Sequence, residues 1–190
     1  MTGNWDGIVE RREFRVFGRV MHPLTLDHLL LLATIESPIL TGIDAAPSDA
    51  LLAAWLCSMP AEIAQTTLER SGSMRAAFET WGAQWGSAAN PADSMLSESG
   101  KLRDYMTYYL RAPRRWGSDR KDAGVKTPWM IFLRTELRRH LACSRAEAGQ
   151  MPACVAFAHY AAIAEANGDK DLMSERDVAE SDRINAEGAP

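Results

Sequence analysis

The sequence lacks long apolar runs, has few cysteines and begins without a targeting signal. Its apolar runs, such as residues 29–33, fall far short of the roughly 20 residues that a membrane-spanning helix needs. The first six residues contain no basic region followed by an apolar stretch, so we expect no signal peptide. Three widely spaced cysteines, Cys57, Cys143 and Cys154, argue against a disulfide framework. We therefore expect a protein of the reducing cytoplasm without a membrane segment.

The chain also lacks the spacing patterns of metal, cofactor and catalytic sites. Its four histidines, His22, His28, His140 and His159, include no pair at metal-ligand spacing, and none has a cysteine at zinc-finger spacing. There is no glycine-rich phosphate loop, no paired-glycine dinucleotide fingerprint and no nucleophile elbow. We therefore predict that the chain is not an enzyme and has no catalytic residues, no metal ligands and no cofactor.

The overall composition is that of one globular domain with a modest negative charge. The chain has 190 residues, of which 46% are hydrophobic, so it can bury a sizeable core. A net charge of −4 predicts solubility and gives no overall attraction to nucleic acid or to an anionic membrane. Neither of these is therefore favoured as a partner.

Helical periodicity dominates the chain and predicts a mainly α fold. Thr25 and Ser48 are expected N-caps, and Pro60, Pro128 and Pro152 suit first turns of helices. Only residues 13–21 alternate like a strand, and a lone strand needs a partner for its backbone groups. We predict a single-domain multi-helix bundle with one short N-terminal strand or extended arm. The expected helices cover residues 25–35, 48–57, 61–86 in two pieces, 98–110, 128–141, 152–166 and 175–185, with a short helical turn at 144–148 and a loop at 87–97.

This pattern divides the chain into three parts. Residues 1–21 form an N-terminal arm or strand, residues 22–168 the helical domain with an exposed basic loop at 111–127, and residues 169–190 an acidic C-terminal helix or tail. The helix within 151–166 is apolar or small on almost every side, which predicts that its own chain or a partner surrounds it. A charge introduced at Ala162 is then expected to be strongly destabilising.

The six tryptophans are many for a chain of this length. Trp55 and Trp129 lie within apolar helical patterns and are expected in the core. Trp81 and Trp85 have small or polar neighbours, and aromatic side chains in such surroundings often anchor protein interfaces. We take these two as candidate partner-binding residues.

The loop at 111–127 contains the other candidate partner-binding residues, Arg114, Arg115, Trp116 and Arg120. Arginines beside an aromatic ring can hold single-stranded nucleic acid through phosphate contacts and stacking. The same composition fits a loop that grips the acidic residues of 169–190, within one chain or between copies, so a homo-oligomer stays open. The acidic chain as a whole and the lack of a nucleic-acid-binding motif favour a protein partner.

Three segments of the sequence are similar in residue pattern to a known group of proteins. They are HPLTLDH at 22–28 followed by SPILTG at 37–42, LAAWLCSMP at 52–60, and MP at 151–152 with the small-residue helix that follows and LMSE at 172–175. Together they resemble small helical proteins encoded in the tail modules of tailed phages and prophages, of the tail assembly chaperone type. In that family, the chaperone holds the long, apolar, helical tape measure protein soluble until tail-tube subunits polymerise around it.

The resemblance implies a non-enzymatic protein of the bacterial host cytoplasm whose partner is the tape measure protein or another tail protein. The family has no catalytic residues, so none are transferred, and the basic loop at 111–127 departs from its pattern. Two alternatives stay open. A structural component of the tail or neck would remain in the virion. A small helical nucleic-acid-binding regulator would use the basic loop, and its binding would weaken steeply with salt.

Overall fold

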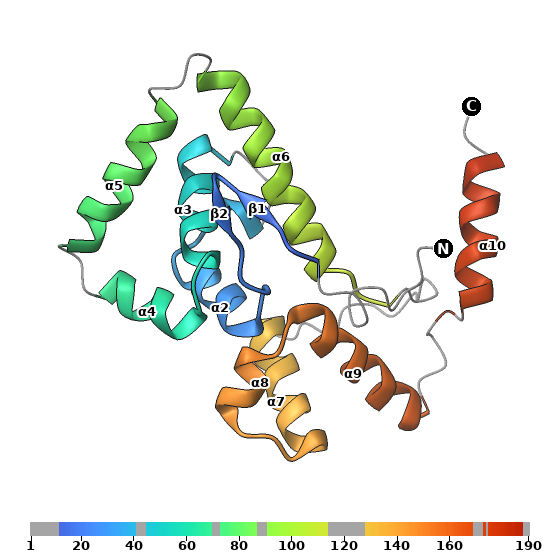
Figure 1. Ribbon diagram of the computed structural model, residues 1–190. Helices are drawn as coiled ribbons and strands as arrows, with labels where there is room; N and C mark the ends of the chain where they lie inside the picture. The colour runs from blue at the N-terminus through green and yellow to red at the C-terminus, as the bar shows by residue number, and fades with distance from the viewer. Residues whose placement is uncertain are drawn as a thin grey trace.

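The protein is a helical bundle with one small β-hairpin, which confirms the predicted mainly α fold (Figure 1). The computed structural model describes residues 12–40, 45–69, 73–86, 91–113, 128–168, 173 and 175–187. No helix in these residues is long and apolar enough to cross a membrane. The elements in chain order are β1 (Arg15–Val16), β2 (Arg19–Val20), α2 (Leu26–Thr34), η1 (Pro38–Leu40), α3 (Pro47–Cys57), α4 (Ala61–Glu69), α5 (Ser73–Gly86), α6 (Pro91–Tyr109), α7 (Trp129–Leu141), α8 (Arg145–Gln150), α9 (Ala153–Ala166) and α10 (Glu175–Glu187).

The N-terminal β-structure is a hairpin rather than the single unpaired strand that the alternation suggested. β1 pairs with β2 in antiparallel fashion through a turn at Phe17 and Gly18. Both turn residues have positive φ, 48° and 73°, which is the backbone form that tight two-residue hairpins favour. The Glu98 carboxylate of α6 accepts a hydrogen bond from the Phe17 N–H and so holds the turn. The segment therefore pairs with itself, and its backbone does not need a strand from a partner.

Helix α2 lies at the centre of the bundle and is capped as expected. Thr25 Oγ1 accepts from the His28 N–H, and Nδ1 of His28 accepts from the Thr25 N–H, each at 3.3 Å. The other ring nitrogen of His28 then carries the proton and donates to the Met59 carbonyl at 2.8 Å. The side chains of Leu26, Leu29 and Leu32 are fully buried, and α2 contacts α3, α4, α7 and α8.

One continuous core joins the hairpin to all the helices from α2 to α9 except α8. Figure 1 shows the hairpin and α3 between α5 and α6, with α7, α8 and α9 below them and α10 standing apart. The start of α9 is tied to the start of α2, because the Ala153 N–H donates to the Leu24 carbonyl at 2.8 Å. An ion pair of 2.9 Å between Asp27 and Arg134 joins α2 to α7.

Two helices begin earlier than the sequence patterns predicted. α3 starts at Pro47, not at Ser48. Its N-cap is Ala46, two residues before the expected N-cap Ser48, and the Asp49 carboxylate accepts a hydrogen bond from the Ala46 N–H and so closes the first turn. α6 starts at Pro91, so most of the expected loop at 87–97 is helical. Small polar residues permit a loop but do not exclude a helix, and α6 is held by its packing on α3, α5 and β1.

The small-residue helix α9 is buried on one side only, contrary to the expectation that protein surrounds it. Ala153, Ala156 and Ala161 are buried, whereas His159 and Ala162 face solvent. The alanines let α9 lie close to α7, and the small size of the exposed alanine side chains explains why the helix looks apolar all round. The predicted penalty for a charge at Ala162 therefore does not hold for this structure.

Candidate protein-binding site

An apolar groove of about 1500 Å³ lies between η1, α3, α5 and α6. We call it the α3–α6 groove. Its floor is the outer surface of the core, to which Leu51, Leu102 and Met106 contribute buried side chains. Its walls hold Ile39, Leu40, Trp85, Met95, Leu96 and Leu110.

Helix α6 lines the groove over almost its whole length. Its lining residues run from Met95 to Thr107 and recur at three- and four-residue intervals, as expected for one face of a helix, and Leu110 and Arg111 continue the lining beyond the end of α6. At a rise of 1.5 Å per residue the helical part of this face is roughly 18 Å long, which is the length of a helix of about 12 residues. Leu96, at one end, is 76% exposed and has no cover from the described part of the chain. The groove therefore has the length and apolar character of a helix-binding site.

Two helical glycines border open space in the groove. Gly82 of α5 and Gly100 of α6 lie inside helices and line the groove. A Cβ added at either position would meet no atom within 4 Å. Neither glycine is therefore required by close packing inside the described chain, although each weakens its helix relative to alanine by about 0.5–1 kcal/mol.

The charged side chains that line the groove in the described residues have one sign. Arg103 and Arg111 line it and are both exposed, and none of its described lining residues is an aspartate or glutamate. This lining is therefore positive, although the whole chain carries a net charge of −4. A charge pattern of this kind sets partner preference and orientation more than it sets affinity.

The two predicted tryptophan anchors lie beside this groove but differ in burial. Trp81 is only 8% exposed and packs edge-on or tilted against Phe17, Trp55 and Phe78, so in this conformation it belongs to the core. Trp85 is half-buried, packs against Phe17 at 5.2 Å between ring centroids and lines the groove. Of the two, only Trp85 is therefore placed where a partner could contact it.

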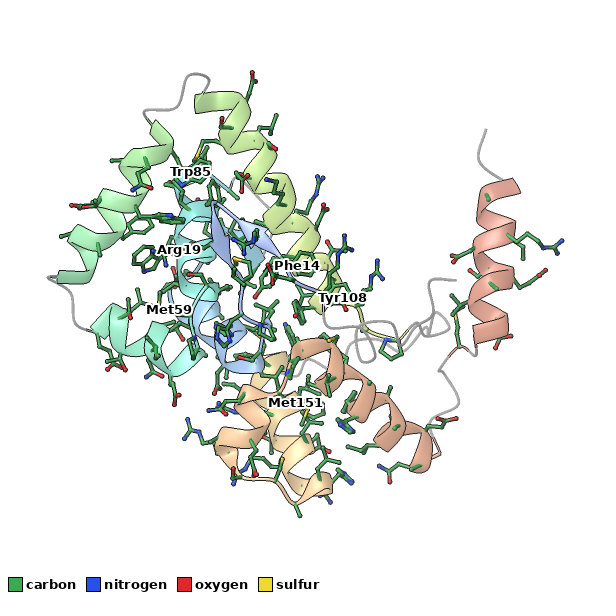
Figure 2. All side chains as sticks on the ribbon, in the orientation of Figure 1. Phe14, Arg19, Met59, Trp85, Tyr108 and Met151 are labelled. Carbon is green, nitrogen blue, oxygen red and sulfur yellow. The ribbon has the colours of Figure 1, made fainter. Side chains whose placement is uncertain are left out.

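An arginine completes the aromatic cluster. The Arg19 guanidinium lies 3.9 Å from the Trp55 ring centroid and 5.0 Å from that of Trp81, as a cation–π pair requires. Figure 2 shows Arg19 and Trp85 in the space between α5 and α3. Nε1 of Trp85 is buried and has no hydrogen-bond partner among the described residues. This cluster fixes α5, and with it one wall of the groove, onto the hairpin and α3.

The remaining predicted partner-binding residues, Arg114, Arg115, Trp116 and Arg120, lie outside the described residues. Their roles, and with them the nucleic-acid alternative, stay predictions.

A second exposed apolar surface lies on α7 and α9, and the sequence patterns did not reveal it. Trp129 stacks on Phe157 with centroids 5.4 Å apart, and Phe132 packs edge-on against Tyr160 at 5.9 Å. Trp129 is 45% exposed, so its expected place in the core is wrong. Its position one residue before the buried Met130 gave it an apolar neighbourhood in the sequence, but that neighbourhood does not determine which face of α7 meets the core.

Two buried titratable side chains of the described core, Cys57 and His28, have shifted pKa values. Burial raises the pKa of the Cys57 thiol to about 12, which keeps the sulfur protonated and unreactive. Burial lowers the pKa of His28, and both of its ring nitrogens are engaged in hydrogen bonds within the chain. The described residues contain no group of three or more histidine, cysteine, aspartate or glutamate side chains placed to hold a metal ion.

Comparison of the sequence with protein-family models finds no match, and comparison of the chain with curated proteins and with solved structures finds none either.

Proposed function

We propose that this chain is a non-enzymatic protein that binds a helical segment of a partner protein in the α3–α6 groove. The observation that carries the proposal is the groove itself, an apolar hollow of about 1500 Å³ that runs along α6. Apolar grooves of this length receive amphipathic helices, whose apolar faces they cover. The covered face would otherwise promote aggregation of the partner.

The resemblance to tail assembly chaperones makes the proposal more specific; it involves residues 22–28, 37–42, 52–60, 151–152 with the small-residue helix that follows, and 172–175. We propose that the partner is the apolar, helical tape measure protein of a phage or prophage. The chain would then act in the cytoplasm of the bacterial host cell, before the tail tube forms. A chaperone needs a surface for apolar helices and no catalytic centre, and the groove supplies such a surface.

Co-expression with the tape measure protein of the same gene cluster tests this function. We expect the tape measure protein to become soluble only in the presence of this chain, and the two proteins to co-elute from a sizing column. Unchanged solubility together with separate elution would remove the chaperone proposal. A point variant of the chain that fails to fold serves as the control for non-specific effects of co-expression.

A second candidate is a structural tail or neck component that remains in the particle. The exposed aromatic pairs Trp129–Phe157 and Phe132–Tyr160 favour it, because a permanent subunit interface covers rings of this kind. Mass spectrometry of purified particles separates the two candidates. A structural component is present in the particle in fixed proportion to the tube subunits, whereas a chaperone is absent.

A further inference from the structure

The α3–α6 groove has features that restrict the kind of helix it can hold. It is apolar, it follows α6 from Met95 to the end of the helix and continues to Arg111, and the charged side chains that line it in the described part of the chain are Arg103 and Arg111. We propose that the groove binds an acidic amphipathic helix, with the apolar face of that helix on the groove floor and its carboxylates against these two arginines. This inference rests on the proposed function, since it specifies the chemistry of the bound partner.

The spacing of the two arginines sets the spacing of the partner's acidic residues. Arg103 lies on α6, and Arg111 lies two residues beyond the last residue of α6, Tyr109. Carboxylates two turns apart on one face of the bound helix, at positions i and i+7 or i+8, would each face one of these arginines. No carboxylate lines the groove among the residues that the structure describes, so a basic helix gains no ion pair from this lining.

The two glycines set how closely the partner backbone approaches. Gly82 and Gly100 line the groove from α5 and α6, and the space next to each is open. Helices approach one another most closely where glycine or alanine removes the side chain from the contact. The bound helix therefore passes over Gly82 and Gly100 and covers Leu96, which is 76% exposed.

The acidic helix α10 of a second copy is the rival occupant. Among its described side chains the large apolar ones are Val178 and Ile184, six residues apart and thus on different faces of the helix. Such a helix cannot cover a groove of about 1500 Å³ that runs along the length of α6. We therefore assign the groove to a partner protein, and the oligomeric state of the chain checks this assignment.

A labelled peptide and matched variants test the inference on the full-length chain. The probe is an 18-residue helical peptide with leucines at three- and four-residue intervals and two glutamates eight residues apart. Its control carries lysines in place of the glutamates. Fluorescence anisotropy at low salt should show binding of the acidic peptide, and weaker binding of the basic one.

Gly100→Trp fills the groove, and Gly100→Ala leaves it open. Because the added Cβ meets no atom within 4 Å at this position, both variants should fold, which their melting curves check. We expect Gly100→Trp to weaken peptide binding about thirtyfold or more, and Gly100→Ala to bind nearly as wild type does. Arg103→Glu should weaken binding of the acidic peptide about fivefold, whereas Arg138→Glu, at an exposed arginine of α7 outside the groove, should not change it.

The same variants tested with the tape measure protein separate this inference from the proposed function. If wild type and Gly100→Trp hold the tape measure protein equally well, or if neither peptide binds wild type, the groove assignment is overturned. Binding of both peptides with equal affinity overturns the acidic specificity, and a wild-type dimer that Gly100→Trp disrupts assigns the groove to a second copy instead. If the acidic peptide binds in the groove but the tape measure protein does not bind at all, the chaperone proposal fails and the groove inference stands.

Discussion

Replacing Gly149 with alanine should destabilise the fold, although alanine is the better helix former. Gly149 is buried near the end of α8. An added Cβ would lie 2.5 Å from Cγ of Asp27 and closer still to its Oδ2, where ordinary van der Waals contact begins at 3.4 Å. Asp27 is short and is held by Arg134 at 2.9 Å, so it can only move away by giving up that ion pair.

The magnitude follows from two opposing terms. The exchange of glycine for alanine inside a helix contributes about 1 kcal/mol in favour of the variant. Loss of a charge-assisted hydrogen bond costs roughly 1.5–3 kcal/mol, and the Arg134 side chain, 15% exposed, would be left without its partner. The net loss is about 0.5–2 kcal/mol, which for a chain of this size lowers the melting temperature by roughly 1–8 °C.

Thermal unfolding followed by circular dichroism measures this effect, and Gly100→Ala is the matched control. At Gly100 the added Cβ meets open space, so this variant should be more stable than wild type by about 0.5–1 kcal/mol. In an Asp27→Ala background the obstacle is gone, and Gly149→Ala should then be neutral or stabilising. If Gly149→Ala raises the melting temperature of the wild-type chain as much as Gly100→Ala does, the contact between α8 and Asp27 is not as described.

Four further predictions concern the buried polar groups and the exposed helices. Burial lowers the pKa of His28 in the folded chain, so the unfolded chain binds the proton more readily. The stability contributed by neutral His28 is therefore fully present above the unfolded pKa of about 6.5 and is lost as the pH falls below it. The melting temperature of His28→Gln should therefore change less between about pH 8 and about pH 5.5 than the melting temperature of wild type does. Tyr105→Phe removes the hydroxyl that donates to the His22 carbonyl at 2.8 Å, so urea unfolding should show a loss of about 1–2 kcal/mol, and an unchanged midpoint would contradict that bond. Ala162→Asp places its charge on the exposed side of α9, so the free energy of unfolding, measured by thermal melting, should change by only about 0.5 kcal/mol. An insoluble variant would restore the view that a partner covers this face. Deletion of residues 178–190 removes most of α10, which stands apart from the other helices in Figure 1, so the melting temperature should stay nearly constant, and global unfolding would show that α10 is a structural layer.

Local signals in the sequence were sufficient for most helix bounds. Thr25 caps α2 and Ser144 caps α8 through side-chain oxygens that accept backbone N–H groups three residues ahead. Pro60 precedes α4, and Pro128 precedes α7. These features act between neighbours in the chain, so the order of residues alone reveals them. They failed at Ser48, because the first turn of α3 is closed by the Asp49 carboxylate, which accepts from the Ala46 N–H, and not by the Ser48 side chain. They also failed at Gly18, whose turn joins two strands that are too short to show separate alternation in the sequence.

The sequence by itself determined that this chain is a mainly α-helical protein with a short β-structure near its N-terminus. Its periodicity, prolines and caps fix helices through interactions within a few residues, and those interactions do not depend on the rest of the fold. Only the tertiary structure decided that Trp81 is buried, that Trp129 is 45% exposed, and that Gly82 and Gly100 face the same groove. The sequence neighbours of Trp81 had predicted an exposed side chain, and those of Trp129 had predicted a buried one. The physical reason is that exposure and grooves arise where helices from distant parts of the chain meet, and the angles at which they pack are not encoded in any one helix.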